Sequence, residues 1–399
     1  MNSSILNSDV QEFITNNLNT ELSKIILKGT HFNGVSTKEI IEQIEAKQKA
    51  KQKLPTWFSS QNIIYPNKLN IEQTSSEITA HYKSKLIKGD SIVDITGGFG
   101  VDCFYFSKYF KYVEHCEINK KLSKIVSHNY TQLQRKNIKT ITANGIEYIN
   151  SRNTDYDWIY IDPSRRHDSK GKVFFLKDCL PNIPVHIENL FKFTKNIIIK
   201  TSPLLDLTIG IRELQYVKEI HIIAVKNEVK ELIWILEKGF KHDISIKTVN
   251  IHKLYTNHFN FKLNEESKSN STLSLPLNYL YEPNAAILKS GAFNTITNQF
   301  SIHKLHRHTH LYTSEQQITF PGRTFKVISV IDYNKKAIKS LHLKHANITT
   351  RNFPESVQQL RKKFNIGDGG DTYIFFTTNH MGNKQVLVCK KLQPLALKK

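Results

Sequence analysis

The sequence predicts an α/β protein built on an open sheet of seven strands, with helices on both faces. Short runs of β-branched residues alternate with helical stretches over residues 77–236. A glycine-rich turn at residues 94–100 joins one such run to the helical stretch after it. The last two runs are separated by residues 226–231, which are too few for a crossover helix. That pair should therefore form an antiparallel hairpin at the end of the sheet.

Residues 1–75 are expected to form an N-terminal helical segment. Apolar residues between positions 8 and 28 recur at helical spacing. Ser36 and Glu39 form a capping-box pattern ahead of a second helix, which Pro55 should end. The lysines between positions 47 and 53 are interpreted either as a phosphate-contacting face or as a solvated helix surface. A packed connector is expected to follow, formed by Trp57, Phe58, Tyr65 and Pro66.

The core domain is predicted to span residues 76–263. Its seven strands are expected at residues 91–96, 112–117, 139–142, 158–162, 196–200, 221–225 and 232–236. A further β segment is expected between residues 240 and 263. Residues 264–271 are rich in Ser, Asn, Glu and Lys, a composition that indicates a flexible linker.

Two small α+β domains are expected after this linker, at residues 276–322 and 323–399. The second alternates strands with helical pieces near Lys335 and Arg361. Its expected strands cover residues 325–330, 372–377 and 385–388.

The charge balance favours a polyanionic partner. Lys and Arg outnumber Asp and Glu by 56 to 35, for a formal charge of +21, so nucleic acid is the first candidate. A lysine-rich bias of the whole proteome is the alternative reading. The four cysteines form no C-x-x-C pair, which argues against a disulfide framework or a thiolate zinc site and suits the cytoplasm. Neither a signal peptide nor a membrane-spanning apolar run is found, so no membrane partner is expected.

The glycine-rich turn predicts a nucleotide-binding loop. Its glycines follow a strand and precede a helix, where the backbone must approach a ligand closely. Cys103 takes the third glycine position of a dinucleotide fingerprint, so that pattern is incomplete. Asp94 suits the cationic ammonium and sulfonium groups of S-adenosylmethionine, which offers no pyrophosphate to a helix N-terminus. A purely structural tight turn is the alternative. The predicted cofactor-binding residues are Asp94, Thr96, Gly97, Gly98 and Gly100.

The ends of the next two strands add three candidates for the same site. Glu117 follows Asp94 by 23 positions, where an acidic side chain meets the ribose hydroxyls of a bound nucleoside in such folds. Asn144 and Gly145 follow the third strand and are predicted to line the adenine. The Asn-Gly pair is also a favoured turn, which is the alternative reading.

Residues 157–166 form the second strong motif, an apolar strand that ends at Asp162 and Pro163 beside two arginines. Methyl transfer is an in-line displacement, so the protein chiefly aligns the reactants and accepts a hydrogen bond from the nucleophile. Asp162 is the candidate catalytic acceptor. The arginines either clamp phosphate or pair with Asp157 or Asp168. The predicted substrate-binding or RNA-binding residues are Pro163, Arg165, Arg166 and Lys200.

A histidine cluster lies at positions 303, 306, 308 and 310. His306, His308 and His310 would share one face of a strand, but no Cys or acidic ligand spacing accompanies them. No metal site is therefore predicted, and RNA-phosphate contact or plain surface is the preferred reading.

The chain resembles the bacterial class I methyltransferases that carry a C-terminal THUMP-like domain, a family met mainly in Bacteroidetes-type proteins. The resemblance spans nearly the whole chain and rests on the segments at residues 54–58, 94–100, 161–166, 227–232, 281–285 and 367–371. It implies a Rossmann-like core that binds S-adenosylmethionine, then a small ferredoxin-like domain and a THUMP-like domain. THUMP domains proper bind RNA in tRNA-modifying enzymes, so the resemblance implies an RNA substrate.

One motif departs from the related amino-methyltransferases, which place two prolines and an aromatic residue after the Asp or Asn. Ser164 and Arg165 stand there instead, so stacking of a flipped base is not implied. The leading hypothesis is a methyltransferase that modifies a base of tRNA or rRNA. The alternatives are a non-catalytic RNA-binding protein on the same scaffold and an NAD-dependent oxidoreductase.

Overall fold

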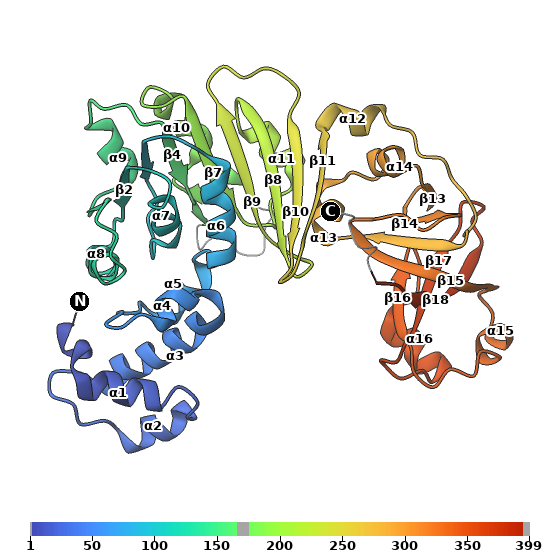
Figure 1. Cartoon of the computed structure of the whole chain (residues 1–399), viewed down its shortest axis with the longest axis horizontal. Helices are drawn as coiled ribbons and strands as arrows, with labels where there is room; N and C mark the ends of the chain where they lie inside the picture. The colour runs from blue at the N-terminus through green and yellow to red at the C-terminus, as the bar shows by residue number, and fades with distance from the viewer. Residues whose placement is uncertain (1, 166–174, 394–399) are drawn as a thin grey trace. The chain divides into compact units, whose positions relative to one another are not determined.

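The computed structural model describes residues 2–165 and 175–393. The chain divides into two compact units (Figure 1). Unit 1 comprises Met1–Lys218 and Leu232–Lys241, and unit 2 comprises Glu219–Glu231 and His242–Lys399.

Unit 1 begins with a group of short helices. They are η1 (Ser3–Leu6), α1 (Ser8–Asn16), α2 (Leu22–Lys28), α3 (Thr37–Lys53), α4 (Pro55–Ser59), α5 (Lys68–Gln73) and α6 (Glu77–Leu86). The capping box predicted at α3 is confirmed, because the Ser36 and Glu39 side chains each accept from the other residue's backbone N–H. The single helical face predicted for positions 8–28 is wrong in one respect: α1 ends at Asn16, and Asn17 caps it before α2 begins.

The predicted connector, which covers α4 and the chain before α5, is packed. Trp57 and Tyr65 are buried, and the Tyr65 hydroxyl donates to the backbone carbonyl of Trp57. The lysines of α3 are mostly engaged: Lys47 contacts Thr15, and Lys49 pairs with Glu72. These contacts favour the reading of this lysine run as a helix surface.

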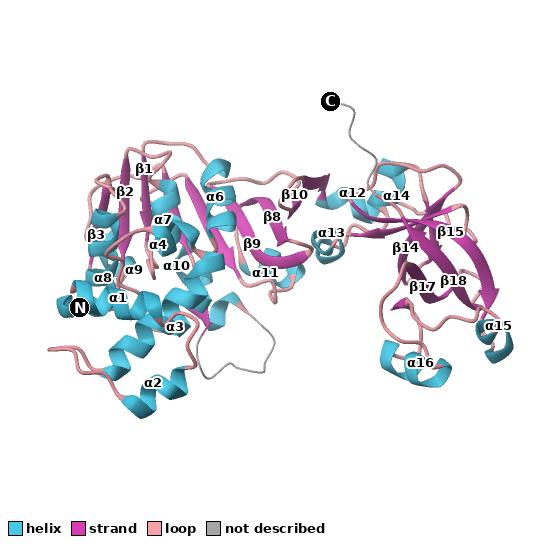
Figure 2. Ribbon diagram, turned by 60° about the horizontal axis from the view of Figure 1, so that its bottom comes forward, coloured by secondary structure: helices cyan, strands magenta, loops and turns pink. Residues whose placement is uncertain are grey.

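The sheet of unit 1 follows the order β9-β7-β4-β1-β2-β3. Figure 2 shows β1, β2 and β3 side by side in it. Its strands are β1 (Ser91–Asp94), β2 (Tyr112–Cys116), β3 (Ile138–Ile141), β4 (Trp158–Ile161), β7 (Asn196–Thr201) and β9 (Glu228–Glu237). All neighbours are parallel except β7 and β9. Parallel strands bring their carboxyl ends to one edge, so the ends of β1, β2, β4 and β7 lie together there.

Helices flank this sheet (Figure 2). They are α7 (Val101–Phe106), α8 (Lys120–Gln132), α9 (Gly145–Asn150), α10 (Ile183–Leu190) and α11 (Leu207–Glu213), with a 3-10 turn, η3, at Leu176–Asp178. The central strands are buried on both faces, as Val93, Ile159 and Ile198 illustrate with no exposed surface. A two-stranded ribbon, β5 (Ser164–Arg165) with β6 (Cys179–Leu180), lies beyond the end of β4.

The predicted antiparallel hairpin is confirmed, but it does not end the sheet, because a further strand pairs with β8. β8 (Val217–Val225) and β9 are neighbours in the sheet, and the turn between them is only two residues long. Lys226 and Asn227 both have positive φ, 51° and 66°, as a tight hairpin turn requires.

Unit 2 carries two further strands of the large sheet, β10 (Ser245–Ile251) and β11 (Thr256–Lys262). β10 runs parallel to β8 and antiparallel to β11. The flexible linker predicted at residues 264–271 is wrong at its start, because α12 (Leu263–Lys268) forms there. Glu266 explains the order, since its carboxylate accepts hydrogen bonds from the backbone N–H groups of Phe293, Asn294 and Thr295.

The rest of unit 2 is a second sheet with the order β13-β14-β12-β15-β18-β17-β16. Its strands are β12 (Tyr279–Pro283), β13 (His303–His306), β14 (Thr309–Ser314), β15 (Gly322–Asp332), β16 (Asn347–Arg351), β17 (Thr372–Thr378) and β18 (Lys384–Lys391). Its helices are α13 (Ala285–Ser290), α14 (Thr295–Phe300), α15 (Lys335–Lys339) and α16 (Val357–Phe364). The predicted strands and helical pieces of this region are confirmed, while β16 was not predicted.

Among the described residues, no helix is both long and apolar enough to cross a membrane.

Candidate cofactor loop and catalytic strand

The glycine-rich loop is organised by the carboxylate of Asp94, at the end of β1. Asp94 Oδ1 accepts hydrogen bonds from the backbone N–H groups of Thr96 and Gly97, at 2.8 and 2.9 Å, and from the Thr96 hydroxyl at 2.9 Å. The side chain is buried, and burial raises its pKa to about 7. Asp94 therefore holds the backbone of the glycine-rich loop in its turn.

The loop glycines have different surroundings. Gly97, Gly98 and Gly100 all have positive φ, of 32°, 62° and 78°. A Cβ on Gly97 would overlap the carbonyl of Cys116, and one on Gly100 would overlap the Tyr130 hydroxyl. A Cβ on Gly98 would meet no atom within 4 Å. Gly98 is thus the point of the loop that is open to a ligand.

Glu117 lies directly after β2, against the open glycine. Its Oε2 accepts from the Gly98 N–H at 2.9 Å, and its Oε1 accepts from the Asn119 N–H at 2.7 Å. Burial raises the pKa of the Glu117 carboxyl. Each carboxylate oxygen has a second lone pair, so the group can also accept from a pair of hydroxyls. The predicted juxtaposition of Glu117 with the loop is therefore found.

Ile118 is a candidate site residue that sequence reasoning missed. It directly follows Glu117, and 71% of it is exposed, although a large aliphatic side chain is usually buried. A flat apolar ligand next to the Glu117 carboxylate would cover this surface. The sequence offered one signal, an apolar residue just past the end of a strand.

Asn144 and Gly145 follow β3 and begin α9. Asn144 Oδ1 caps the helix by accepting from the backbone N–H groups of Ile146 and Glu147. A Cβ on Gly145 would overlap the carbonyl of Ile95, the residue after Asp94. Gly145 therefore lets α9 approach the glycine-rich loop closely.

A single hydroxyl joins the glycine-rich loop to the candidate catalytic strand. Thr96 Oγ1 donates to Asp94 and accepts from the backbone N–H of Asp162, at 2.7 Å. Asp162 follows β4, at the carboxyl edge of the sheet. The two strongest sequence motifs, 66 positions apart, are thus in direct contact.

Asp162 is paired with a lysine from the neighbouring strand. Lys200 Nζ, on β7, lies 2.5 Å from Asp162 Oδ2. One third of the Asp162 side chain is exposed, against 12% for Lys200. Lys200, predicted as a substrate-binding residue, thus contacts the candidate catalytic carboxylate and fixes its orientation.

The structure describes only some of the other predicted substrate-binding residues. Pro163 is buried, and Ser164 and Arg165 form the short strand β5. Arg166 and Asp168 lie outside the described residues. Asp157, one predicted partner of the arginines, instead accepts from the backbone N–H groups of Asp90 and Ser91.

A buried charge cluster joins α6 and α7. Lys83, on α6, has no exposed surface, and its Nζ lies 3.0 Å from Asp102 Oδ1 on α7. Asp102 Oδ2 accepts from the hydroxyls of Ser75 and Tyr160. Burial raises the pKa of Asp102, but the ammonium groups of Lys83 and Lys200 outweigh burial and hold it below its ordinary value. The Lys83–Asp102 cluster ties α6 to α7, the helix that begins at the glycine-rich loop.

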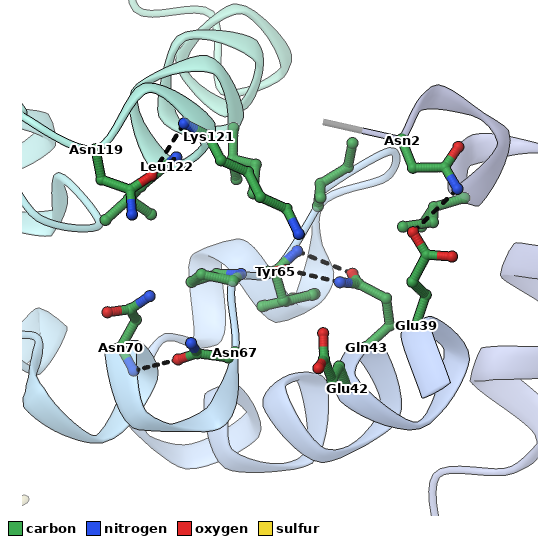
Figure 3. Close-up of a pocket in the computed structure, with 14 residues that line it drawn as sticks. Asn2, Glu39, Glu42, Gln43, Tyr65, Asn67, Asn70, Asn119, Lys121 and Leu122 are labelled. Carbon is green, nitrogen blue, oxygen red and sulfur yellow. Dashed lines mark hydrogen bonds between the residues drawn. The ribbon is translucent and has the colours of Figure 1, made fainter. Parts of the chain in front are cut away.

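Unit 1 also contains a cavity of about 200 Å³ between α3, α8 and the chain before α5 (Figure 3). Its rim is polar and includes Glu42, Asn67, Asn70 and Lys121. Gln43 is not free to bind a ligand, because its amide exchanges two hydrogen bonds with the backbone of Tyr65. Asn119, whose N–H donates to Glu117, is among the residues that line the cavity.

The histidines of the predicted cluster belong to unit 2. His306, His308 and His310 do not share one strand face, because His306 ends β13, His308 lies in the turn after it, and His310 is on β14. His306 Nδ1 is in hydrogen-bond contact with the His308 N–H and the Asn352 amide, each at 3.0 Å. The His310 ring stacks on Phe293 at 3.6 Å between centroids. No group of three or more His, Cys, Asp or Glu side chains in the described part of the chain could hold a metal ion.

Comparisons with known proteins identify two domain families in the C-terminal part of the chain. A ferredoxin-like domain family matches residues 279–321, and a THUMP domain-like family matches residues 322–391. These matches confirm the ferredoxin-like and THUMP-like character predicted for this region. A search of the curated proteins found no match.

A crystal structure of a candidate methyltransferase from Porphyromonas gingivalis W83 matches nearly the whole chain. The identity is 30%, the match covers 98% of each chain, and the TM-score is 0.87. A candidate methyltransferase from Streptococcus mutans in complex with SAH is 14% identical, covering 40% of this chain and 96% of its own, with a TM-score of 0.30. An rRNA methylase from Streptococcus thermophilus is 15% identical, covering 41% and 95%, also at 0.30. These two partial matches say nothing about the activity of this chain.

Proposed function

We propose that this chain is an S-adenosylmethionine-dependent methyltransferase acting on RNA. The premise is that the chain belongs to the family of the Porphyromonas gingivalis protein. The observation that carries the proposal is the Thr96 hydroxyl, which bonds both to Asp94 of the glycine-rich loop and to the backbone of Asp162. A cofactor held at the loop and a nucleophile held at Asp162 would therefore meet at one sheet edge.

The residues at the loop fit a nucleoside. Gly98 leaves open space, the Glu117 carboxylate can accept two ribose hydroxyls, and the exposed Ile118 offers an apolar surface to the adenine. Asp94, Thr96, Gly97 and Gly100 would hold the loop in shape, and Asn144 and Gly145 would border the adenine. Bound S-adenosylmethionine would supply the methyl group.

Asp162 would orient the nucleophile by accepting a hydrogen bond from it. Alignment of the attacking atom is the main contribution that a protein makes to an in-line displacement. Lys200 would keep the Asp162 carboxylate in place, as their 2.5 Å contact suggests. Pro163, Arg165 and Arg166 would border the substrate.

The RNA partner is supported by the charge and by the C-terminal domains. The formal charge of +21 suits a polyanion, and the THUMP-like region adds a module of a kind associated with RNA. We propose a base of tRNA or rRNA as the target, and the reducing cytoplasm as the location. We also propose four domains, at residues 1–75, 76–263, 276–322 and 323–399.

The proposal is tested by methyl transfer from labelled S-adenosylmethionine to total cellular RNA. Asp162→Ala should abolish transfer, because the nucleophile loses its acceptor, while binding of S-adenosylhomocysteine stays unchanged. Lys200→Ala should slow transfer less, since Asp162 keeps its carboxylate. Undiminished transfer by Asp162→Ala would show that this residue is not the acceptor.

A non-catalytic RNA-binding protein is the second candidate. The observation in its favour is that Lys200 already occupies Asp162 Oδ2, beside the departure at Ser164 and Arg165. This candidate predicts RNA binding without transfer by the wild-type chain, on any RNA offered.

A further inference from the structure

Two turns of unit 2 are held together beside the first turn of α13 (Figure 1). The Lys226 N–H donates to the Ile251 carbonyl at 2.9 Å, and the Asn227 N–H donates to the Asn250 side chain at 2.9 Å. The Ala285 N–H in turn donates to Asn227 Oδ1 at 2.8 Å. The turn after β8 and the turn after β10 therefore form one supported surface.

An aromatic pair and an exposed leucine lie on the turn after β10. The rings of His252 and Tyr255 stack with their centroids 4.5 Å apart and an interplanar angle of 24°. The His252 N–H donates to the Tyr255 carbonyl, which fixes the turn beneath the rings. Leu254 is 90% exposed and Tyr255 is 49% exposed. An ordered aromatic ring is thus presented to solvent with one of its faces backed by a second ring.

Each of the two turns also carries a lysine. Lys226 and Lys253 are exposed, and within the described residues neither forms an ion pair. The acidic residue in these turns, Glu228, is already paired with Lys230 at 2.6 Å. The surface therefore combines a stacked aromatic pair with two uncompensated positive charges.

We propose that Lys226, His252, Lys253, Leu254 and Tyr255 form a platform that binds an unpaired base of single-stranded RNA. Bases stack on exposed aromatic rings, and lysines beside the ring contact the flanking phosphates. A protein partner fits less well, because two exposed apolar side chains fall far short of the roughly 800 Å² per partner in a stable interface. The inference rests on RNA being the partner in the proposed function.

The contacts that order the platform in the free protein affect its affinity for RNA. The turn is fixed by backbone hydrogen bonds, and Tyr255 is already stacked in the free protein. Binding would therefore order few additional groups, which lowers the entropic cost of association.

The experiment measures binding of the full-length chain to a labelled single-stranded oligoribonucleotide of about 12 nucleotides, by fluorescence anisotropy. Tyr255→Ala should weaken binding by about tenfold to a hundredfold, as expected when one base loses its stacking partner. Tyr255→Phe should keep wild-type affinity, because the ring remains. Tyr109→Ala is the matched control, since Tyr109 in unit 1 is 46% exposed and should not affect binding.

Salt dependence gives a second readout. For a single strand, each phosphate contact adds about 0.7 to the magnitude of the slope of log affinity against log salt concentration. The double variant Lys226→Ala, Lys253→Ala should therefore lower that magnitude by about 1.4. Wild-type affinity in Tyr255→Ala would overturn the platform, as would an equal loss in Tyr109→Ala. Titration of each variant with S-adenosylhomocysteine separates the platform from the proposed methyltransferase activity. If the wild-type chain does not bind S-adenosylhomocysteine, that result counts against the methyltransferase alone.

Discussion

Replacing the buried Lys83 with Met should destabilise unit 1 by about 3–5 kcal/mol, because Asp102 would keep a buried charge without its nearest cation. Lys83 has no exposed surface, and its Nζ lies 3.0 Å from Asp102 Oδ1 and 2.8 Å from the Ser75 hydroxyl. A typical domain is stable by only about 5–15 kcal/mol, so this loss is a large share of the total.

Urea unfolding followed by tryptophan fluorescence suits this test. The three tryptophans of the chain, Trp57, Trp158 and Trp234, all belong to unit 1, so their signal reports on that unit. The midpoint should fall at an unchanged slope, as expected when stability alone changes.

Two further variants sharpen the result. Lys111→Met breaks a pair of similar length, 3.0 Å to Asp90, whose side chains are 69% and 65% exposed. Lys111→Met should lower the stability of unit 1 far less than Lys83→Met does, because water screens exposed ion pairs. Lys83→Met combined with Asp102→Asn should recover part of the loss, since no uncompensated charge remains. Equal effects of Lys83→Met and Lys111→Met would refute the assignment of the buried pair.

Three other predictions concern the glycine-rich site. Gly100→Ala should lower the melting temperature more than Gly98→Ala, because both have positive φ but only the Gly100 Cβ would overlap Tyr130; equal shifts would contradict this. Burial raises the pKa of Asp94 from 3.8 to about 7, so the folded state retains a proton that the unfolded chain releases. Stability should therefore fall as pH rises from about 4 to about 7 and then level off, and Asp94→Asn should remove this component when melting is compared at about pH 5 and about pH 8.5. Ile118→Asp should weaken binding of S-adenosylhomocysteine about tenfold or more without changing the melting temperature, because it places a charge where the adenine would pack; unchanged affinity would show that Ile118 does not contact the cofactor.

The local parts of the site could be predicted from the sequence, and the contacts between distant residues could not. The glycine turn at Gly97 and Gly98 follows from a strand, an acid and a helix start within a few positions. The Thr96 bond to Asp162 joins residues 66 positions apart, and the Lys200 contact spans 38. No periodicity carries that information, because it depends on which strands become neighbours in the sheet.

Composition did not reveal two features of the structure. A lysine in a polar helix is ordinarily a surface residue, so nothing marks Lys83 as buried, but Asp102 makes its burial tolerable. The stretch after Lys262 looks like a flexible linker, yet Glu266 orders it by accepting three backbone hydrogen bonds. In both cases a partner distant in sequence supplied the compensating interaction.

The most direct test of the account is a calorimetric titration of the purified chain with S-adenosylmethionine, S-adenosylhomocysteine and NAD. A Gly98→Asp variant, which fills the open point of the loop, serves as the comparison. The account predicts binding of the first two ligands in the micromolar range, no binding of NAD, and loss of binding in the variant. Tight binding of NAD, or no binding of either sulfur compound, would contradict it.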